Sequence, residues 1–146
     1  MKLLTILLTA FLLHVSADWN LDFEKAKSEA SQGHKYILLN FSGSDWCAPC
    51  IKLKKDIFEA DAFKAYATDH LVLVRADFPR SKKNQLDKAQ TARNEALAET
   101  YNTQGKFPLT LLLDANGKVV KVWDGYVDKT PEAFVTELDG ATRAAN

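Results

Sequence analysis

Residues 36–50 read YILLNFSGSDWCAPC, and this stretch decides the fold. Its first part, Tyr36 to Phe41, is a short and almost continuous apolar run, which is typical of a buried central strand. Small and polar residues end the run at 42–45. From Cys50 to Phe58, apolar residues recur among lysines in a helix-like pattern. The two cysteines, Cys47 and Cys50, are therefore predicted to lie where a strand passes into a helix.

Beyond this stretch, helical and strand-like patterns alternate along the chain. Apolar residues recur at helical spacing in some segments, and one more apolar run has the length of a buried strand. The predicted helices cover residues 19–31, 60–68 and 85–101, and the predicted strand covers residues 70–76. The connection over 77–84 is polar and contains a proline, so we expect a loop there.

The C-terminal part predicts a hairpin followed by a helix. Apolar runs over 109–113 and 119–123 flank Asn116-Gly117, a dipeptide that favours a tight turn between antiparallel strands. Thr130-Pro131 supplies an N-cap residue and a proline at the first helical position, so a final helix should run to about Ala141. Alternating units with a terminal hairpin predict an α/β fold with helices on both faces of a mixed central sheet.

The composition suits a single globular domain. The chain has 146 residues, of which 47% are hydrophobic and 26% are charged. Lysine plus arginine and aspartate plus glutamate both total 19, so the formal net charge is zero. Since this balance offers no general basic surface, we expect neither nucleic acid nor an acidic membrane surface as a partner. We expect the protein to be a monomer.

The first residues have the pattern of a secretory signal peptide. Met1-Lys2 is a positive start, residues 3–13 are nearly all apolar, and Val15-Ser16-Ala17 has the form of a signal-peptidase site. We therefore predict a signal peptide over 1–17, a mature domain over 18–146, and a periplasmic or secreted protein. The apolar run is about half of the roughly 20 residues that a membrane span needs, so no stable membrane insertion is expected after cleavage. An uncleaved N-terminal anchor remains the alternative.

The cysteine pair is the candidate reactive site. The chain has no other cysteine, and two intervening residues let the sulfurs of Cys47 and Cys50 share one turn at a helix start. Free N–H groups and the positive end of the helix dipole favour a thiolate at Cys47. We expect Cys47, at the exposed N-terminal edge, to be the nucleophile and Cys50 to be the resolving thiol. Pro49 suits an early helical position, and Trp46 would offer an apolar surface to a partner polypeptide.

Two plainer uses of the cysteine pair stay open, a half-site for zinc and a passive local disulfide. Zinc sites normally need four ligands, no second cysteine pair exists, and His34 and His70 are isolated in the sequence. We therefore predict no metal and no other cofactor. In an oxidising compartment the pair would be kept as a disulfide unless a dedicated reductant acts on it.

The sequence resembles the thioredoxin superfamily over residues 36–141, in the motif WCAPC from Trp46 to Cys50 and in Phe107-Pro108 just before the hairpin. Residues 41–47 are more similar to exported bacterial thioredoxin-like proteins than to cytosolic thioredoxins. The resemblance implies a thioredoxin-like three-layer sandwich and a thiol:disulfide oxidoreductase whose redox-active disulfide joins Cys47 and Cys50. Its partners would be protein disulfide or dithiol substrates and an upstream thiol reductant or oxidant. By resemblance, Ala-Pro between the cysteines favours a reducing role.

The resemblance also implies a substrate-binding surface formed by Trp46, Pro49, Phe107 and Pro108. In the family, the proline before the third strand is cis and faces the cysteine pair, and the residue before it offers backbone hydrogen bonds to a substrate. Pro108 fits this position, with a trans proline that merely starts a strand as the alternative. The bulky Phe107 is a departure that would narrow the groove or change its preference, unless it only packs. A partner-binding module with a redox-inert cysteine pair is the alternative function.

Asn40 is a second departure from the family. Cytosolic thioredoxins carry a buried acid in the strand before the motif, which helps to deprotonate the resolving thiol, and Asn40 occupies that place here. An amide cannot act as a general base. Water, a nearby lysine such as Lys54, or the substrate would then take the proton, or resolution would be slower. An ordinary packing substitution is the alternative.

Other conspicuous residues have simpler interpretations. Lys82-Lys83 is interpreted as a solvated pair of charges in a loop. Asp45 either modulates the cysteine pair electrostatically or caps the helix that follows. Four apolar residues in helical or strand patterns are assigned to the core rather than to a site. They are Phe63, Trp123, Phe134 and Val135.

Overall fold

A mixed sheet forms the centre of the protein. The computed structural model describes residues 18–145, and these contain five strands. The strands are β1 (Trp19–Asn20), β2 (Tyr36–Ser42), β3 (Leu71–Asp77), β4 (Leu109–Leu113) and β5 (Val119–Asp124). Their order across the sheet is β1-β3-β2-β4-β5; β1, β3 and β2 are parallel, whereas β4 runs antiparallel to β2 and β5 antiparallel to β4. The predicted mixed sheet with a terminal hairpin is confirmed.

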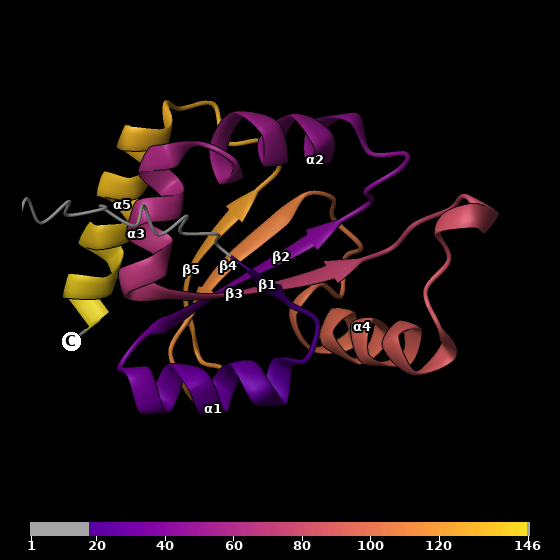
Figure 1. Ribbon diagram of the computed structural model, residues 1–146, viewed down its shortest axis with the longest axis horizontal. Coiled ribbons are helices and arrows are strands. Elements are labelled where there is room, and N and C mark those ends of the chain that lie inside the picture. Colours follow the sequence, from indigo (N-terminus) through magenta and orange to yellow (C-terminus); the bar gives the residue numbers. More distant parts are fainter. Residues whose placement is uncertain (1–17, 146) are drawn as a thin grey trace, which may run out of the picture.

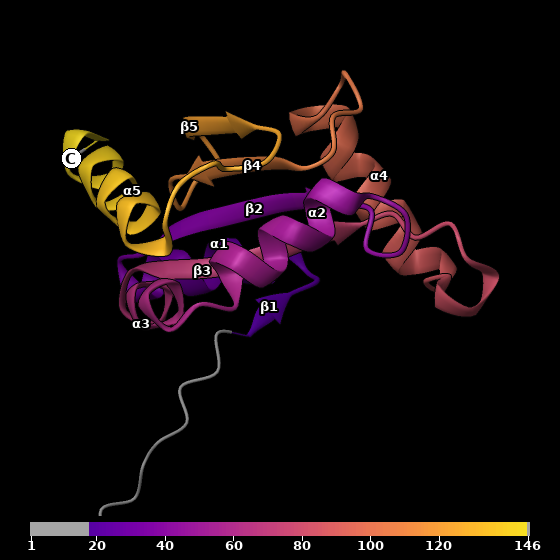
Figure 2. The same cartoon turned by 90° about the horizontal axis from the view of Figure 1, so that it is seen from above.

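Helices cover both faces of the sheet (Figures 1 and 2). They are α1 (Phe23–Gly33), α2 (Ala48–Leu53), α3 (Asp61–His70), α4 (Lys88–Tyr101) and α5 (Pro131–Ala145). A π-helical turn, η1 (Lys54–Phe58), continues α2, and a short 3-10 turn, η2 (Lys82–Asn84), lies between β3 and α4. Because α2, α3 and α5 lie on one face and α1 and α4 on the other, the predicted three-layer sandwich is confirmed (Figure 1).

The side chains of β2 alternate between the two faces, as those of any strand do. Leu38 belongs to the core beneath α3 and α5, whereas Leu39 belongs to the core on the face of α1 and α4. Asn40 returns to the first face together with Thr110, its partner in the β2–β4 register. The alternation therefore places one polar pair among apolar neighbours, at the end of β2 from which the chain leads to α2.

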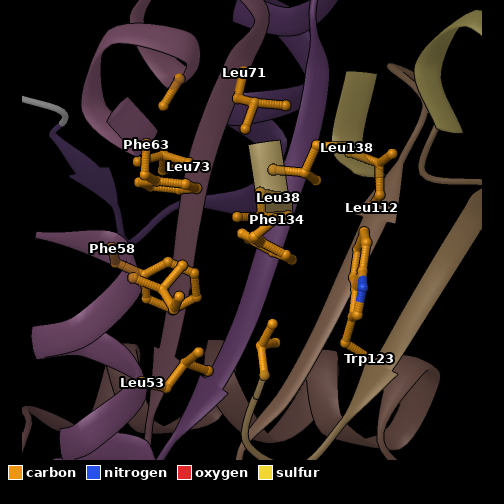
Figure 3. Packing of buried hydrophobic residues seen from close by; sticks show 13 residues of the cluster. Leu38, Leu53, Phe58, Phe63, Leu71, Leu73, Leu112, Trp123, Phe134 and Leu138 are labelled. Atoms are coloured by element: carbon orange, nitrogen blue, oxygen red, sulfur yellow. The ribbon is translucent and has the colours of Figure 1, made fainter. Parts of the chain in front are cut away.

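The core beneath α3 and α5 is rich in aromatic rings (Figure 3). Phe63 and Phe134 are fully buried and Trp123 is 9% exposed, while Val135 packs half-buried against the same cluster. These four residues were assigned to the core from their sequence pattern, and the assignment is confirmed. None of them forms part of the cysteine site.

The N-terminal segment differs from its prediction. The helix expected over 19–31 begins only at Phe23, because Asp22 caps it by accepting a hydrogen bond from the N–H of Lys25 at 3.0 Å. The preceding residues form β1 instead, where Trp19 pairs with Leu73 in parallel. A strand of two residues is too short to show an alternating pattern, and its partner is more than fifty positions away. Local sequence could not reveal it.

The other helix boundaries shift by a few residues. The helix expected over 85–101 begins at Lys88, because the carboxylate of Asp87 accepts from the N–H of Gln90 at 2.7 Å and so caps α4. Thr130 caps α5 as predicted, with its Oγ1 accepting from the N–H of Ala133 at 3.2 Å, and this helix continues past 141 to residue 145. Capping residues were thus the most reliable guide to helix starts.

The predicted signal peptide, residues 1–17, lies outside the described residues. Within residues 18–145, no helix combines the length and the apolar composition that crossing a bilayer requires.

Candidate active site

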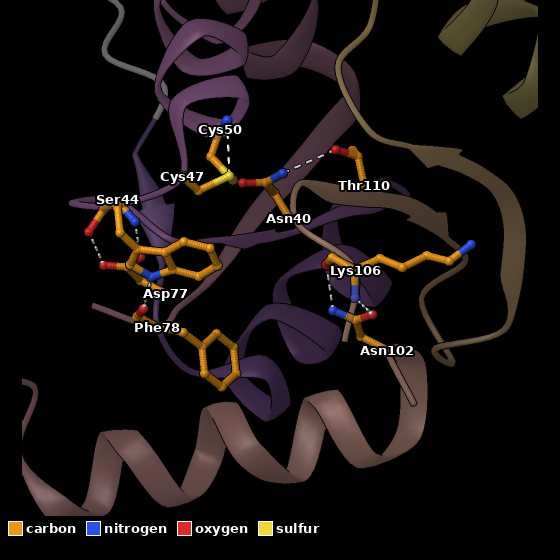
Figure 4. Close-up of a disulfide and its surroundings, with 10 residues drawn as sticks. Asn40, Ser44, Cys47, Cys50, Asp77, Phe78, Asn102, Lys106 and Thr110 are labelled. Carbon is orange, nitrogen blue, oxygen red and sulfur yellow. Dashed lines mark hydrogen bonds between the residues drawn. A yellow bond between two sulfur atoms is a disulfide. The ribbon is translucent and has the colours of Figure 1, made fainter. Parts of the chain in front are cut away.

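The cysteine pair lies at the N-terminus of α2 and forms a disulfide (Figure 4). The two Sγ atoms are 2.11 Å apart and the Cα atoms of Cys47 and Cys50 are 5.2 Å apart. Cys47 is the N-cap residue of α2, and its Sγ accepts a hydrogen bond from the N–H of Cys50 at 3.3 Å. Pro49 lies in the first turn, where a missing N–H leaves no bond unmade. The predicted place of the pair, between a strand and a helix, is confirmed.

Both cysteines are nearly buried in this oxidised form. Cys47 and Cys50 each expose 4% of their surface, so the expectation that Cys47 lies at an exposed edge is wrong. The N–H of Cys47 donates to the carbonyl of Gly43 at 2.9 Å, which folds the turn before α2 tightly, and the disulfide faces Asn40 rather than solvent (Figure 4). What distinguishes the two sulfurs is therefore position. Cys47 stands at the helix start, next to unpaired N–H groups, and Cys50 lies inside the first turn.

Asn40 lies beside the disulfide, on the sheet side of it (Figure 4). Its side chain is nearly buried, and its Nδ2 donates to Oγ1 of Thr110 at 3.1 Å. This bond leaves the amide oxygen turned toward the cysteine pair, as Figure 4 shows. The group next to the sulfurs is therefore polar but uncharged, and it cannot remove a proton. Thr110 carried no signal of its own, because it sits within the apolar run of β4.

The lysine considered as a proton acceptor is engaged elsewhere. Nζ of Lys54 lies 3.5 Å from Oε1 of Glu59, and about half of each side chain is exposed. The structure gives Lys54 no contact with Cys50, so this suggestion is not supported. Water or the leaving thiolate of the substrate is left to take that proton.

The indole of Trp46 is fixed beside the cysteine pair by three contacts. Its Nε1 donates to the carbonyl of Phe78 at 2.7 Å. Its ring meets the ring of Phe107 edge-on at 5.4 Å, and the guanidinium carbon of Arg80 lies 3.7 Å from the ring centroid. The apolar surface expected next to Cys47 is therefore present, and it is held by residues from two distant segments.

Gly43 leaves the space that this indole occupies. A Cβ added at Gly43 would lie 2.3 Å from Cε2 and 2.6 Å from Nε1 of Trp46. We expect Gly43→Ala to displace the indole and to break its bond to Phe78. Small misplacements near a reacting centre can cost up to about a hundredfold, so client reduction should fall by about ten- to a hundredfold.

The measurement for Gly43→Ala is the NMR shift of the Trp46 indole N–H together with the rate of disulfide reduction. Gly140→Ala is the matched control, because a Cβ at Gly140 meets nothing within 4 Å. This control should keep both the indole shift and the rate. An unchanged indole shift in Gly43→Ala would contradict the steric argument.

Asp45 does not cap α2, because Cys47 is the N-cap residue. Its carboxylate accepts hydrogen bonds from the backbone N–H groups of Arg80 and Ser81, both at 2.9 Å, and from Nδ2 of Asn84 at 3.0 Å. These bonds, that from Arg80 foremost, stabilise the anion and lower the pKa of Asp45 below its usual value. Asp45 thus ties the loop after β3 to the residues just before Cys47.

The peptide bond between Phe107 and Pro108 is cis, as the family resemblance implied. The ring of Phe107 packs edge-on against Phe78 at 5.5 Å, as it does against Trp46. Pro108 is buried, and its carbonyl accepts from the N–H of Gly125 at 2.9 Å. Within the described part of the chain, no hydrogen bond uses the backbone N–H or C=O of Phe107. Trp46 and Phe107 are thus brought together, and Pro108 follows directly.

Two polar residues that the sequence did not single out support these loops. Asn102, which is 6% exposed, closes the loop before Phe107: its Nδ2 donates to the carbonyl of Lys106 and its Oδ1 accepts from the N–H of Lys106, both at 2.8 Å. Asp77, at the end of β3, accepts from the N–H of Ser44 at 2.9 Å. An asparagine after a helix signals a loop, but its partner depends on the folded path of the chain.

The histidines lie apart from the cysteine pair. His34 ends α1 in a left-handed conformation with φ of 52°, and the ring of His70 lies 4.5 Å from that of Tyr66. Among residues 18–145, no group of three or more histidine, cysteine, aspartate or glutamate side chains is placed to hold a metal. The described site is therefore a site for thiol chemistry.

Comparison with known proteins gives the same fold and a related chemistry. A family model for a thioredoxin-like domain matches residues 23–142. Disulfide bond reductase DsbH of Chlamydia pneumoniae is 40% identical over 121 residues, which are 83% of this chain and 70% of that protein. A solved structure of a DsbH oxidoreductase has a TM-score of 0.81 at 30% identity, covering 97% of this chain and 95% of the other. A thioredoxin from Thermus thermophilus, with a TM-score of 0.59 at 15% identity over 81% of this chain and 82% of its own, shares the fold alone.

Proposed function

The chain belongs to the thioredoxin-like domain family and is a thiol:disulfide oxidoreductase, and on this premise we propose that it reduces disulfides in client proteins. The observation that carries the proposal is the Cys47–Cys50 disulfide at the start of α2. A helix start lowers thiol pKa values, which favours Cys47 as the attacking thiolate once the disulfide has been reduced. Cys50, inside the first turn, is the resolving thiol.

The proposed reaction moves two electrons from the dithiol to the client. The thiolate of Cys47 attacks one sulfur of the client disulfide, which forms a mixed disulfide and releases the other client sulfur as a thiolate. Cys50 then loses its proton and attacks Sγ of Cys47, which breaks the mixed disulfide and releases the second client thiolate. The product is the Cys47–Cys50 disulfide seen here. An upstream thiol reductant must restore the dithiol for another cycle.

The client is proposed to lie across Trp46, Pro49, Phe107 and Pro108. Trp46 and Phe107 form a continuous aromatic surface beside the disulfide, with their ring centroids 5.4 Å apart. The backbone N–H and C=O of Phe107 are free to pair with an extended client chain. Burial of both sulfurs, each residue being 4% exposed, means that the client must fit closely against this surface before exchange.

We place this activity outside the cytoplasm, with the chain cleaved after Ala17. The support is the N-terminal sequence pattern, with its positive start, its apolar run and its cleavage site. In an oxidising compartment the dithiol form persists only if a reductant supplies it. The name of the DsbH relative, a disulfide bond reductase, and the Ala-Pro pair between the cysteines both favour the reducing direction.

Insulin reduction in the presence of dithiothreitol tests the proposal. Lowering a thiol pKa from about 8.5 to about 7 raises its thiolate fraction at pH 7 from about 3% to about 50%, so we expect roughly tenfold acceleration over dithiothreitol alone. The double variant Cys47→Ser/Cys50→Ser is the control and should give none. Absence of acceleration by the natural chain, with partner binding retained in the double variant, would instead support a redox-inert binding module.

A further inference from the structure

A positively charged segment lies next to the cysteine site. We call residues 79–88 the basic loop; it carries Arg80, Lys82, Lys83 and Lys88, all exposed. In Figures 1 and 2 this part of the chain projects from the end of the sheet at which β2 and β3 finish. That is also the end from which the chain leads into α2, so the cations stand on the side of the molecule where a client must approach.

The cations of the basic loop are not neutralised by the protein. The described residues form eight ion pairs, and none of them involves the basic loop. The one carboxylate in the loop, Asp87, accepts from the N–H of Gln90 and caps α4. Elsewhere lysines pair with nearby carboxylates, for example Lys106 with Asp124. The local charge is therefore positive although the chain as a whole has a net charge of zero.

The basic loop is held in a fixed relation to Cys47. Asp45 accepts two backbone N–H groups at the start of the loop and the side chain of Asn84. Trp46 donates to the carbonyl of Phe78, the residue just before the loop, and the guanidinium of Arg80 stacks on the indole. Asp45 and Trp46 are the two residues that precede Cys47. A charged group bound by the loop would therefore be positioned relative to the reacting sulfur.

The groove behind the loop does not suit an acidic ligand. It has a volume of about 520 Å³ and lies between the loop and α4. Besides apolar residues such as Phe78 and Leu86, it is lined by the carboxylates of Asp77 and Glu95. Like charges would repel an acidic chain there. The exposed lysines of the loop, not the groove, are thus the part that favours negative charge.

We propose that the basic loop binds an acidic segment of the client polypeptide next to the disulfide that is reduced. This inference rests on the proposed reductase function and adds a preference among clients. Exposed charges of opposite sign steer encounter and select partners more than they add affinity, and salt weakens them. The loop therefore acts on kcat/KM and leaves the chemistry at Cys47 unchanged.

The test compares peptides that carry the same internal disulfide, flanked by glutamates in one and by glutamines in the other. Several exposed charge pairs of modest individual strength add up to about tenfold, so the natural chain should show about tenfold higher kcat/KM for the acidic peptide. The triple variant Lys82→Gln/Lys83→Gln/Lys88→Gln should lose this preference and keep its rate on the neutral peptide. Salt at about 1 M, where the Debye length is about 3 Å, should also abolish the preference.

The control variant Lys64→Gln/Lys118→Gln removes cations that form no ion pair in the described chain and lie away from the basic loop. It should keep the full preference. Fluorescence anisotropy with serine-substituted forms of both peptides measures binding without chemistry, so a failure of the reductase proposal is seen separately as no reduction of either peptide. Equal kcat/KM and equal binding for the two peptides, or a preference that survives in the triple variant, would overturn the inference. So would lysine-dependent sedimentation with anionic phospholipid vesicles in the absence of any peptide preference.

Discussion

Cys47→Ser is expected to abolish client reduction, whereas Cys50→Ser is expected to stop the reaction halfway. Without the Cys47 thiolate no sulfur attacks the client, and loss of a nucleophile costs on the order of 10³-fold or more. Cys50→Ser keeps the nucleophile but lacks the thiol that breaks the mixed disulfide. Client protein should therefore accumulate as a covalent adduct on Cys47. Non-reducing gels and intact mass measure that adduct directly.

The assignment of roles rests on position in α2 and not on exposure. Both residues are 4% exposed, but only Cys47 occupies the N-cap, where helix N–H groups are free. The matched comparison is the same adduct measurement with Cys47→Ser, which should trap little client through Cys50. Equal trapping by the two variants would mean that the roles of nucleophile and resolving thiol are wrongly assigned.

Phe134→Ala is expected to cause the largest loss of stability away from the site. Phe134 is fully buried in the core beneath α3 and α5, with its ring 5.2 Å from Trp123 and 6.2 Å from Phe63. Removing such a ring leaves a cavity and costs about 3–5 kcal/mol, out of a total of about 5–15 kcal/mol for a domain of this kind. Urea unfolding followed by circular dichroism measures the loss.

Val135→Ala is the matched control for this core prediction. Val135 is the next residue of α5 and only packs half-buried against the same cluster, so its truncation should cost clearly less. The folded fraction of Phe134→Ala should still reduce clients, because Phe134 has no part in the cysteine site. A loss below about 1 kcal/mol for Phe134→Ala would show that this core does not stabilise the domain as described.

Features whose cause is local were predicted well from the sequence. The apolar run of β2, the turn at Asn116-Gly117 and the cap at Thr130 each depend on neighbouring residues, and each is present as predicted. β1 was not predicted, because its two residues are strand only through their pairing with β3. The π-helical turn η1 likewise leaves no separate pattern in a segment that reads as continuous helix.

The site was predicted in its chemistry but not in its supports. The cysteine pair and the cis Pro108 followed from the motif and from family resemblance. The roles of Gly43 and Asp45 did not, because each acts on a segment more than thirty residues away or on a ring whose direction is set by that segment. The burial of Cys47 was missed for a related reason, since the turn that draws it inward is defined by backbone geometry.

The reduction potential of the Cys47–Cys50 pair tests the central claim most directly. It is obtained by equilibrating the natural chain with defined thiol buffers, alkylating the free thiols and measuring the dithiol fraction by mass. A protein that donates electrons to client disulfides should lie near the reductant range, at about −270 mV, and each 30 mV corresponds to about 1.4 kcal/mol. A value near about −120 mV, in the range of strong oxidants, would contradict the assignment as a reductase.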